Sequence, residues 1–475
     1  MKKIIRYAAI LAALCCLSCR AVVNLDRPED YIRAGANTDP SAITWASVFE
    51  SYWTGMNNNY LFWSIDPTDW DKVYDDYQGK FAALDVTSEA DFQTAYRYFQ
   101  DITKDLVDGH YYLVIYDLNG NTKQLNPWAA RYYREHGLDL YEYLDSGRDT
   151  SILERSPSYM RSDYYAERFS RNPKLGAAVE SRFIGNSGTY AKAAISDYDG
   201  VDFSNFAMST GSLPVSGGCI LYFQFTNFDY YDINGYYDYY EAEGIYAQID
   251  TGNTAGKSDE ELLADPAFTD ETLRLALEMR IVRNKTLQFF ADLKSPDVKG
   301  VIVDLRGNGG GYAVDLSWIW GRMITREHTF TYNRSKLGDN RLDYSPWFSQ
   351  KIFPAPDGIE LTVPVVALVN KLSVSCSELS AMIVASLPNG YVVGGTTYGA
   401  QGGLTGNREY NGGQFTAPLL ELVFTPSVQL KYLDGNIYEG KGFPPDIPVD
   451  FDYDALEAGT DKRLEAAIRC VLEHQ

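Results

Sequence analysis

The stretch that decides the fold of this chain is Val301-Ile302-Val303-Asp304-Leu305-Arg306-Gly307-Asn308-Gly309-Gly310-Gly311. A buried strand is predicted over its first residues, and the strand ends in a turn with four glycines among five residues. Glycine adopts positive φ angles and lets the backbone approach a ligand closely, and successive N–H groups in such a turn form an anion-binding concavity. The turn lacks the Gly-Lys-Ser/Thr of a P-loop. We expect it to hold a phosphate or the oxyanion of an acyl-transfer intermediate, or to be a tight turn without a ligand.

A second strand followed by a turn occurs further along the chain. An apolar run over residues 364–370 leads into Lys371-Leu372-Ser373-Val374-Ser375-Cys376-Ser377-Glu378-Leu379, and a helix is predicted to begin near Glu378. A serine at a helix N-terminus lies in positive potential, where the next N–H groups can face a developing oxyanion. Serine and glutamate are also ordinary capping residues, so this stretch alone leaves both interpretations open.

Helices and strands are predicted to alternate around these two turns. Apolar residues at helical spacing predict helices over 49–60 and 92–106, the second with Ser88 as its N-cap. A long amphipathic helix is expected over 269–293, and the segment 228–240, rich in tyrosine and aspartate, has a turn at Asn234-Gly235. Strands are expected at 111–116, 219–225, 300–304, 363–369, 391–393 and 420–424. This pattern predicts the α/β class, with a helix-covered sheet.

The first residues have the pattern of a targeting segment. Lys2, Lys3 and Arg6 precede an apolar run over 8–17 that is too short for a membrane-spanning helix of ~20 residues. The run ends in Ser18-Cys19, which resembles a bacterial lipoprotein processing site. We therefore predict lipidation of Cys19 and a membrane-anchored protein of the cell envelope that faces the periplasm or the cell exterior. An ordinary cleaved signal peptide is the alternative.

Six segments are expected along the chain. They are a signal peptide (1–19), a tether (20–40), an N-terminal helical domain (41–110), an inserted region of unclear fold (111–216), a core (217–455) and a C-terminal helix (456–475).

Charge and cysteine content exclude several classes of partner. The formal net charge of −22 argues against nucleic acid and anionic membrane surfaces, which would repel the chain. Cys219, Cys376 and Cys470 are too widely spaced to imply a disulfide framework. The four histidines are scattered, so no metal site and no cofactor are predicted.

The two turns and a third motif together resemble the family of C-terminal processing peptidases and the tricorn core peptidase. That family has Asp-Leu-Arg-x-Asn-x-Gly-Gly, then Asn and Ser-Ala-Ser-Glu, then Gly-x-x-Thr-x-Gly. Here these motifs are Asp304 to Gly311, then Asn370 with Ser375-Cys376-Ser377-Glu378, and Gly394-Gly395-Thr396-Thr397-Tyr398-Gly399. The resemblance covers about residues 217–455. It implies the α/β core of this family with an N-terminal helical domain, and hydrolysis of peptides or unfolded proteins through an acyl-enzyme.

The resemblance also implies roles for particular residues. It makes Ser375 the nucleophile, and Gly309, Gly310 and Cys376 the donors of the oxyanion hole. The processing peptidases have a base lysine directly after the third motif, and here that position holds Ala400.

The tricorn branch instead uses an early histidine and a late glutamate, and the matching positions are His110 and Glu439. Imidazole is a suitable base for a serine, and a carboxylate can hold its tautomer. That branch has a serine just before its histidine, where this chain has Gly109. Without the histidine, Lys371 or Lys441 would be the base to consider.

Two other functions remain open from the sequence. The same fold resembles the retinoid-binding modules of the photoreceptor matrix, and the missing lysine favours such a non-catalytic ligand- or peptide-binding homologue. The high tyrosine content would suit a surface lipoprotein that binds glycans or a partner. The joint presence of Ser375, His110 and Glu439 favours the peptidase.

Overall fold

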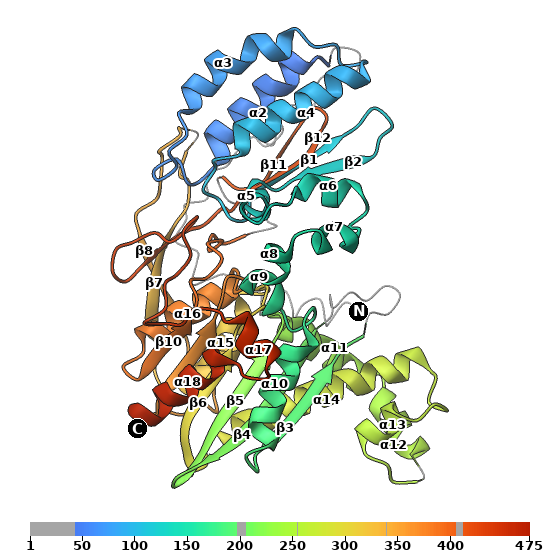
Figure 1. Cartoon of the computed structure of the whole chain (residues 1–475), viewed down its shortest axis with the longest axis vertical. Coiled ribbons are helices and arrows are strands. Elements are labelled where there is room, and N and C mark those ends of the chain that lie inside the picture. Colours follow the sequence, from blue (N-terminus) through green and yellow to red (C-terminus); the bar gives the residue numbers. More distant parts are fainter. Residues whose placement is uncertain (1–42, 197–205, 254, 339, 405–411) are drawn as a thin grey trace.

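The computed structural model describes residues 43–196, 206–253, 255–338, 340–404 and 412–475. The predicted signal peptide, the tether and Cys19 lie outside these residues. Figure 1 shows a helical lobe at one end of the molecule and a larger sheet-containing lobe at the other, with a chain of short helices between them. In the described ranges no helix combines the length and the apolar character needed to cross a membrane.

The helical lobe packs three helices on a small antiparallel sheet. The helices are α2 (Trp45–Asn59), α3 (Trp70–Ala82) and α4 (Glu89–Thr103), and the strand order is β11 (Phe415–Ala417), β12 (Leu420–Phe424), β1 (Tyr112–Tyr116), β2 (Thr122–Leu125). The Ser88 side chain caps α4 by accepting the Asp91 N–H, as predicted. Buried aromatic side chains fill the lobe, and the Phe49 and Phe81 rings stack 4.8 Å apart.

A seven-stranded sheet forms the larger lobe. Its order is β14 (Ile447–Pro448), β10 (Gly390–Gly394), β9 (Val365–Val369), β6 (Val298–Asp304), β5 (Gly218–Phe225), β4 (Ala207–Val215), β3 (Thr189–Ala194). The strands from β14 to β5 are parallel to one another, and β4 and β3 are antiparallel additions. The prediction of a helix-covered α/β core is confirmed.

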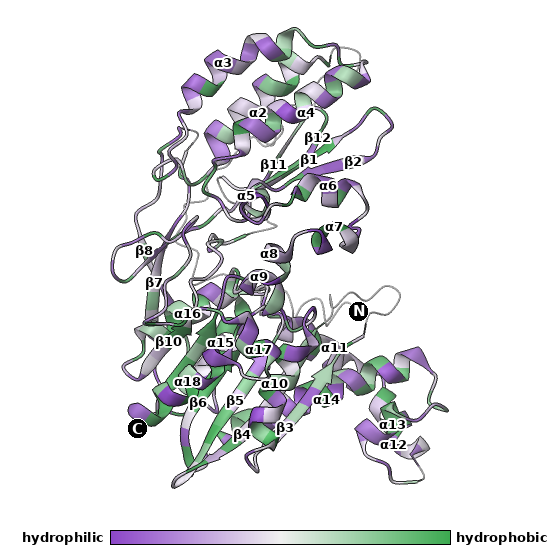
Figure 2. Ribbon diagram, in the orientation of Figure 1, coloured by the Kyte–Doolittle hydropathy of each residue, from purple (hydrophilic) through white to green (hydrophobic). Residues whose placement is uncertain are grey.

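Successive side chains of β6 point to opposite faces of the sheet, and both faces are buried. Val301 and Val303 pack into one core with residues of α14 (Glu271–Asp292), α15 (Val314–Trp320) and α16 (Cys376–Ser386). Ile302 packs on the opposite face with α10 (Pro173–Ile184) and α18 (Lys462–Glu473). A central parallel strand is apolar on both sides for this reason, and Figure 2 shows these strands in green between helices of mixed colour.

The remaining elements complete the connections. A three-stranded sheet has the order β13 (Gln429–Tyr432), β7 (His328–Arg334), β8 (Phe348–Ile352). The other helices are α5 (Pro127–Glu135), α6 (Leu140–Asp145), α7 (Thr150–Glu154), α8 (Pro157–Met160), α9 (Asp163–Ala166), α11 (Tyr230–Ala242), α12 (Ile245–Gly252), α13 (Asp259–Leu263), η3 (Gly321–Met323) and α17 (Tyr453–Glu457).

The structure differs from the sequence-based expectations in three places. The segment predicted to turn at Asn234-Gly235 is helix α11, because Tyr230, Ile233 and Tyr240 share a buried face. The strand predicted at 420–424 pairs with β1 in the helical lobe rather than with the core strands. The region of unclear fold is divided: β1 and β2 join the helical lobe, α5 to α9 connect the lobes, and β3 and β4 extend the large sheet.

Candidate active site

Ser375 lies in a strained turn between β9 and α16. Its backbone has φ +56° and ψ −117°, a conformation that costs a non-glycine residue free energy. The Ser375 N–H donates to the Ala400 carbonyl at 3.1 Å and to Glu378 Oε2 at 3.2 Å. These two bonds hold the strained conformation, which leaves Ser375 partly exposed at the N-terminus of α16.

The glycine turn after β6 packs directly against Ser375. Gly310 has φ +90°, and a Cβ placed on it would lie 2.6 Å from the Ser375 Cβ and 3.1 Å from the Cys376 nitrogen. Only glycine fits this contact, because a methyl group has no room and the φ is left-handed. The two turns that the sequence predicted to cooperate are therefore in contact.

The predicted oxyanion donors are not equivalent in this structure. The Gly309 N–H donates to the Thr226 carbonyl at 3.0 Å, and the Gly310 N–H donates to Asn308 Oδ1 at 2.9 Å. In contrast to the prediction, neither glycine presents a free N–H beside Ser375. The Cys376 N–H, at the start of α16, has no acceptor among the described residues.

The other polar residues of the two motifs hold the turns together. Asn308 accepts hydrogen bonds from the Ser377 hydroxyl at its backbone carbonyl (3.0 Å) and at Oδ1 (2.5 Å). The Ser373 hydroxyl donates to the Leu305 carbonyl at 2.8 Å. Ser373 and Ser377 thus hold the two turns together, and Asn308 shapes the glycine turn.

Arg306 holds the same turn in place through a buried network of ion pairs. Its guanidinium is fully buried and pairs with Asp304, Asp461 and Glu167 at 2.7 to 2.9 Å. Glu167 also pairs with Arg463. The three carboxylates hold the pKa of Arg306 well above its ordinary value despite its burial. The network ties β6 to the region of α9 and to the N-terminus of α18.

Glu378 has a larger structural role than the helix capping that the sequence indicated. Its buried carboxylate accepts the Thr397 hydroxyl at 2.6 Å and the N–H groups of Gly399 and Ala400, both at 2.8 Å. Burial raises the pKa of Glu378, and these donors oppose that shift. Glu378 therefore holds the Gly-x-x-Thr-x-Gly loop against the N-terminus of α16.

His110 and Glu439 come from distant parts of the chain and meet beside Asp108. One side-chain ligand atom from each of these three residues lies within 4.8 Å of the other two. Glu439 Oε1 accepts the Gly109 N–H at 2.9 Å. Its Oε2 accepts the N–H groups of Gln401 and Gly402, both at 2.8 Å. Glu439 therefore joins the His110 loop to the loop that follows Ala400.

The His110 ring makes no hydrogen bond to any residue that the structure describes. Its Nδ1 is buried and unpaired, and among the described residues no hydrogen bond joins the ring to Ser375 or to Glu439. Burial lowers the pKa of His110 to about 4, because the imidazolium loses its hydration. The neutral form is the one that can accept a proton from a serine.

The two lysines considered as alternative bases are placed differently. Lys371 is partly buried, and its Nζ donates to the carbonyls of Thr397 and Tyr398 at 3.3 and 3.2 Å. It also lies 5.2 Å from the centre of the Trp128 ring. Burial lowers the pKa of Lys371. Lys441 is exposed.

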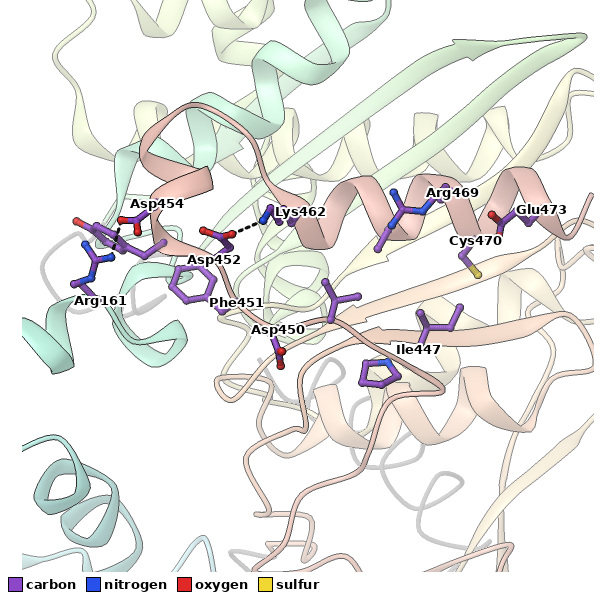
Figure 3. Close-up of a pocket in the computed structure, with 14 residues that line it drawn as sticks. Arg161, Ile447, Asp450, Phe451, Asp452, Asp454, Lys462, Arg469, Cys470 and Glu473 are labelled. Carbon is purple, nitrogen blue, oxygen red and sulfur yellow. Dashed lines mark hydrogen bonds and ion pairs between the residues drawn. The ribbon is translucent and has the colours of Figure 1, made fainter.

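A polar cavity of about 750 Å³ lies elsewhere in the larger lobe. Figure 3 shows it between α18 and the segment after β14, with the ion pairs of Arg161 with Asp454 and of Lys462 with Asp452. Ser375, His110 and Glu439 do not line this cavity.

The segment that contains Ser375 is similar in sequence to known peptidases. Residues 275–449 match the model of peptidase family S41. The carboxy-terminal processing protease CtpB of Bacillus subtilis (strain 168) is 26% identical over 108 residues, which cover 23% of this chain and 20% of that relative. The chain thus matches about a fifth of the length of this curated relative.

Two solved structures share the fold. A putative peptidase from Parabacteroides merdae ATCC 43184 has a TM-score of 0.56 at 18% identity, covering 90% of this chain and 97% of that one. Mature CPAF has a TM-score of 0.50 at 10% identity, covering 90% and 97%. At these identities the likeness concerns the fold, while the matched family segment contains the glycine turn, Ser375 and Glu439. Over residues 275–449 the chain is therefore similar to peptidase family S41.

Proposed function

We propose that this protein is a serine endopeptidase in which Ser375 is the nucleophile, His110 the general base and Glu439 the acid that supports it. The observation that carries the proposal is the strained Ser375 turn, packed on Gly310 at the N-terminus of α16. A serine that only caps a helix needs no positive φ, since N-caps ordinarily have extended backbone. Strain of this kind is found where a side chain must be presented for chemistry.

The proposed reaction proceeds through an acyl-enzyme. The Ser375 Oγ attacks the carbonyl carbon of the peptide, and its proton passes to the neutral His110 ring. The carbonyl oxygen becomes an oxyanion that the Cys376 N–H and the positive end of α16 stabilise. When the tetrahedral intermediate collapses, the C–N bond breaks and His110 returns the proton to the leaving amine. Water then releases the acyl group by the same steps.

Ala400 connects the proposed base to the proposed nucleophile. The Ala400 carbonyl accepts the Ser375 N–H, and Gly109, the residue before His110, packs against the Ala400 side chain. Catalytic hydrogen bonds often form only with substrate bound, and we expect the bond between His110 and Ser375 to form in that state.

A fluorophosphonate probe tests the assignment directly. We expect the wild-type protein to be labelled at Ser375, and Ser375→Ala to abolish both labelling and peptide hydrolysis. Ser349→Ala, which changes an exposed serine of β8, is the matched control and should leave both unchanged. Equal labelling of the wild type and Ser375→Ala would refute the proposal.

The second candidate is a non-catalytic peptide- or ligand-binding homologue. The unpaired His110 ring and the internally bonded N–H groups of Gly309 and Gly310 favour it. Absence of labelling together with saturable binding of an unfolded peptide would support this function instead.

We also propose that the mature chain is a lipoprotein of the bacterial cell envelope, anchored through Cys19. The basic residues, the short apolar run and Ser18-Cys19 support this. Palmitate should label the wild type but not Cys19→Ala, and the wild type should partition into detergent. A soluble, unlabelled mature protein from the wild-type gene would contradict it.

A further inference from the structure

Asp108 is a buried acid beside His110 that the proposed triad does not use. It is fully buried and lies two residues before His110. Its Oδ1 accepts the His110 N–H at 2.8 Å, and its Oδ2 accepts the Thr425 hydroxyl at 2.7 Å. The carboxylate therefore fixes the backbone of His110, and it also lies within 4.8 Å of both the imidazole and Glu439.

Glu439 is already engaged by the backbone. Both of its oxygens accept N–H groups, from Gly109, Gln401 and Gly402. These donors stabilise a negative charge on Glu439 but hold its oxygens toward the two loops. The Asp108 carboxylate accepts the His110 N–H and the Thr425 hydroxyl, and the Tyr111 N–H also favours its charged form. Both acids are therefore held in place by donors from the surrounding loops.

Two buried carboxylates this close do not both ionise readily. Their mutual repulsion in a poorly hydrated site favours a shared proton, as in other carboxylate pairs. The other titratable groups that face the pair are acids or phenols, namely Asp66, Tyr60, Tyr111 and Glu378. Burial raises the pKa of Asp108 to about 7, and burial with the nearby Asp108 raises that of Glu439 well above its ordinary value.

We propose that Asp108 is a positioning residue for His110 and forms with Glu439 an acid pair that holds one proton and one negative charge beside the imidazole. This inference rests on the proposed function of His110 as base. When the Ser375 proton moves to His110, the single charge of the pair stabilises the imidazolium. No proton leaves the pair, and the Ser375 proton goes on to the leaving amine.

A double-mutant cycle separates the pair from a single acid. Asp108→Asn and Glu439→Gln each leave one carboxylate, so each variant keeps the negative charge. We expect each to lose no more than about tenfold in kcat, with KM little changed. The double variant removes the charge and should lose about 10³-fold or more, well beyond the product of the single effects. The acid limb of kcat/KM should move to lower pH only in the double variant.

Three kinetic outcomes would overturn the proposal. If Glu439 acts alone, Glu439→Gln will be as slow as the double variant. If Asp108 is only structural, Asp108→Asn will lower Tm without changing kcat or the acid limb. If the two carboxylates act independently, their effects on kcat will multiply. Should Asp108→Asn fail to fold by circular dichroism, Thr425→Val takes its place, since it removes a donor from Asp108 but keeps both acids. Glu439→Gln combined with Thr425→Val should then be slower than either alone.

The shared proton can also be tested without measuring catalysis, through the dependence of stability on pH. In the folded state the pair holds a proton between the unfolded carboxyl pKa, about 4, and the raised folded pKa. Across that window the unfolded chain binds fewer protons, so the stability of the wild type falls as pH rises toward about 7. Each single variant should lose this component of the slope of Tm against pH. Identical slopes in the wild type and both variants would reject the shared proton, even if Ser375→Ala showed that the protein is no peptidase.

Discussion

Gly109 and Ala400 touch across the site, so that a Cβ on Gly109 would lie 2.6 Å from the Ala400 Cβ and 2.5 Å from the Gly399 carbonyl oxygen. These are two of the positions at which the chain departs from the family patterns that it resembles, a lysine at 400 in one branch and a serine at 109 in the other. In this structure the contact leaves no room for a side chain at position 109 beside Ala400.

The contact predicts that neither family residue can be restored by itself. Gly109→Ser should lower Tm and peptidase activity, because its side chain would collide with the carbonyl of Gly399. Ala400→Lys should do the same, since Ala400 is fully buried and a lysine would displace the His110 loop. Thermal denaturation and peptide hydrolysis measure both effects. Gly79→Ser, at a helical glycine with open space around its Cβ position, is the control. A fully active, stable Ala400→Lys enzyme would contradict this account.

Alanine substitutions at two neighbouring glycines should differ in their effect on activity. Gly310→Ala places a methyl group 2.6 Å from the Ser375 Cβ at a left-handed φ, so we expect activity to fall by about 10²-fold or more through displacement of the nucleophile. Gly309→Ala meets only Asn227 Oδ1, at 3.3 Å, and should retain most activity. Labelling of Ser375 by a fluorophosphonate compares the two variants. Similar losses in both would show that the turn does not act through the contact with Ser375.

The pH dependence of activity should extend to acid pH. A base must be neutral to accept the serine proton, and burial lowers the pKa of His110 from about 6.5 to about 4. The value of kcat/KM should therefore stay level as pH falls through 6.5 and decline only toward about 4. Initial rates between pH 4 and 8 on a stable fraction of enzyme test this. A decline centred on the ordinary histidine value would show that the ring is hydrated in the working enzyme.

The ion network under the glycine turn should be important for stability. Arg306→Met leaves three buried carboxylates with one fewer cation, and we expect a loss of about 3–5 kcal/mol in the free energy of unfolding. Urea denaturation followed by fluorescence measures the change. The matched control is Lys72→Met, which removes an ion pair whose two side chains are both exposed, so the stability should not change detectably. A wild-type midpoint for Arg306→Met would exclude a stabilising role for the network.

Much of the local structure was decided by the sequence. Apolar spacing alone located α2, α4, α14 and the central strands, because a helix or strand that buries one face must repeat its apolar residues with a fixed period. The glycines after β6 and the small residues around Ser375 marked two turns whose backbone conformations few other residues allow. Those motifs also indicated the similarity to peptidase family S41 over residues 275–449. Local rules failed at α11, where the segment predicted to turn at Asn234-Gly235 is a helix whose buried face packs in the same core as α14.

Only the tertiary structure decided how the site is assembled. The sequence suggested His110 and Glu439, but it could not show that Glu439 binds the backbone of Gly109 rather than the imidazole. Nor could it reveal Asp108 as a second acid, since its proximity to Glu439 arises from the packing of β1 against β12 and the loops beyond them. Contacts between residues so far apart in the chain depend on the shape of every element between them. The sequence therefore determined which groups are present, and the fold determined the charge, hydration and reach of each.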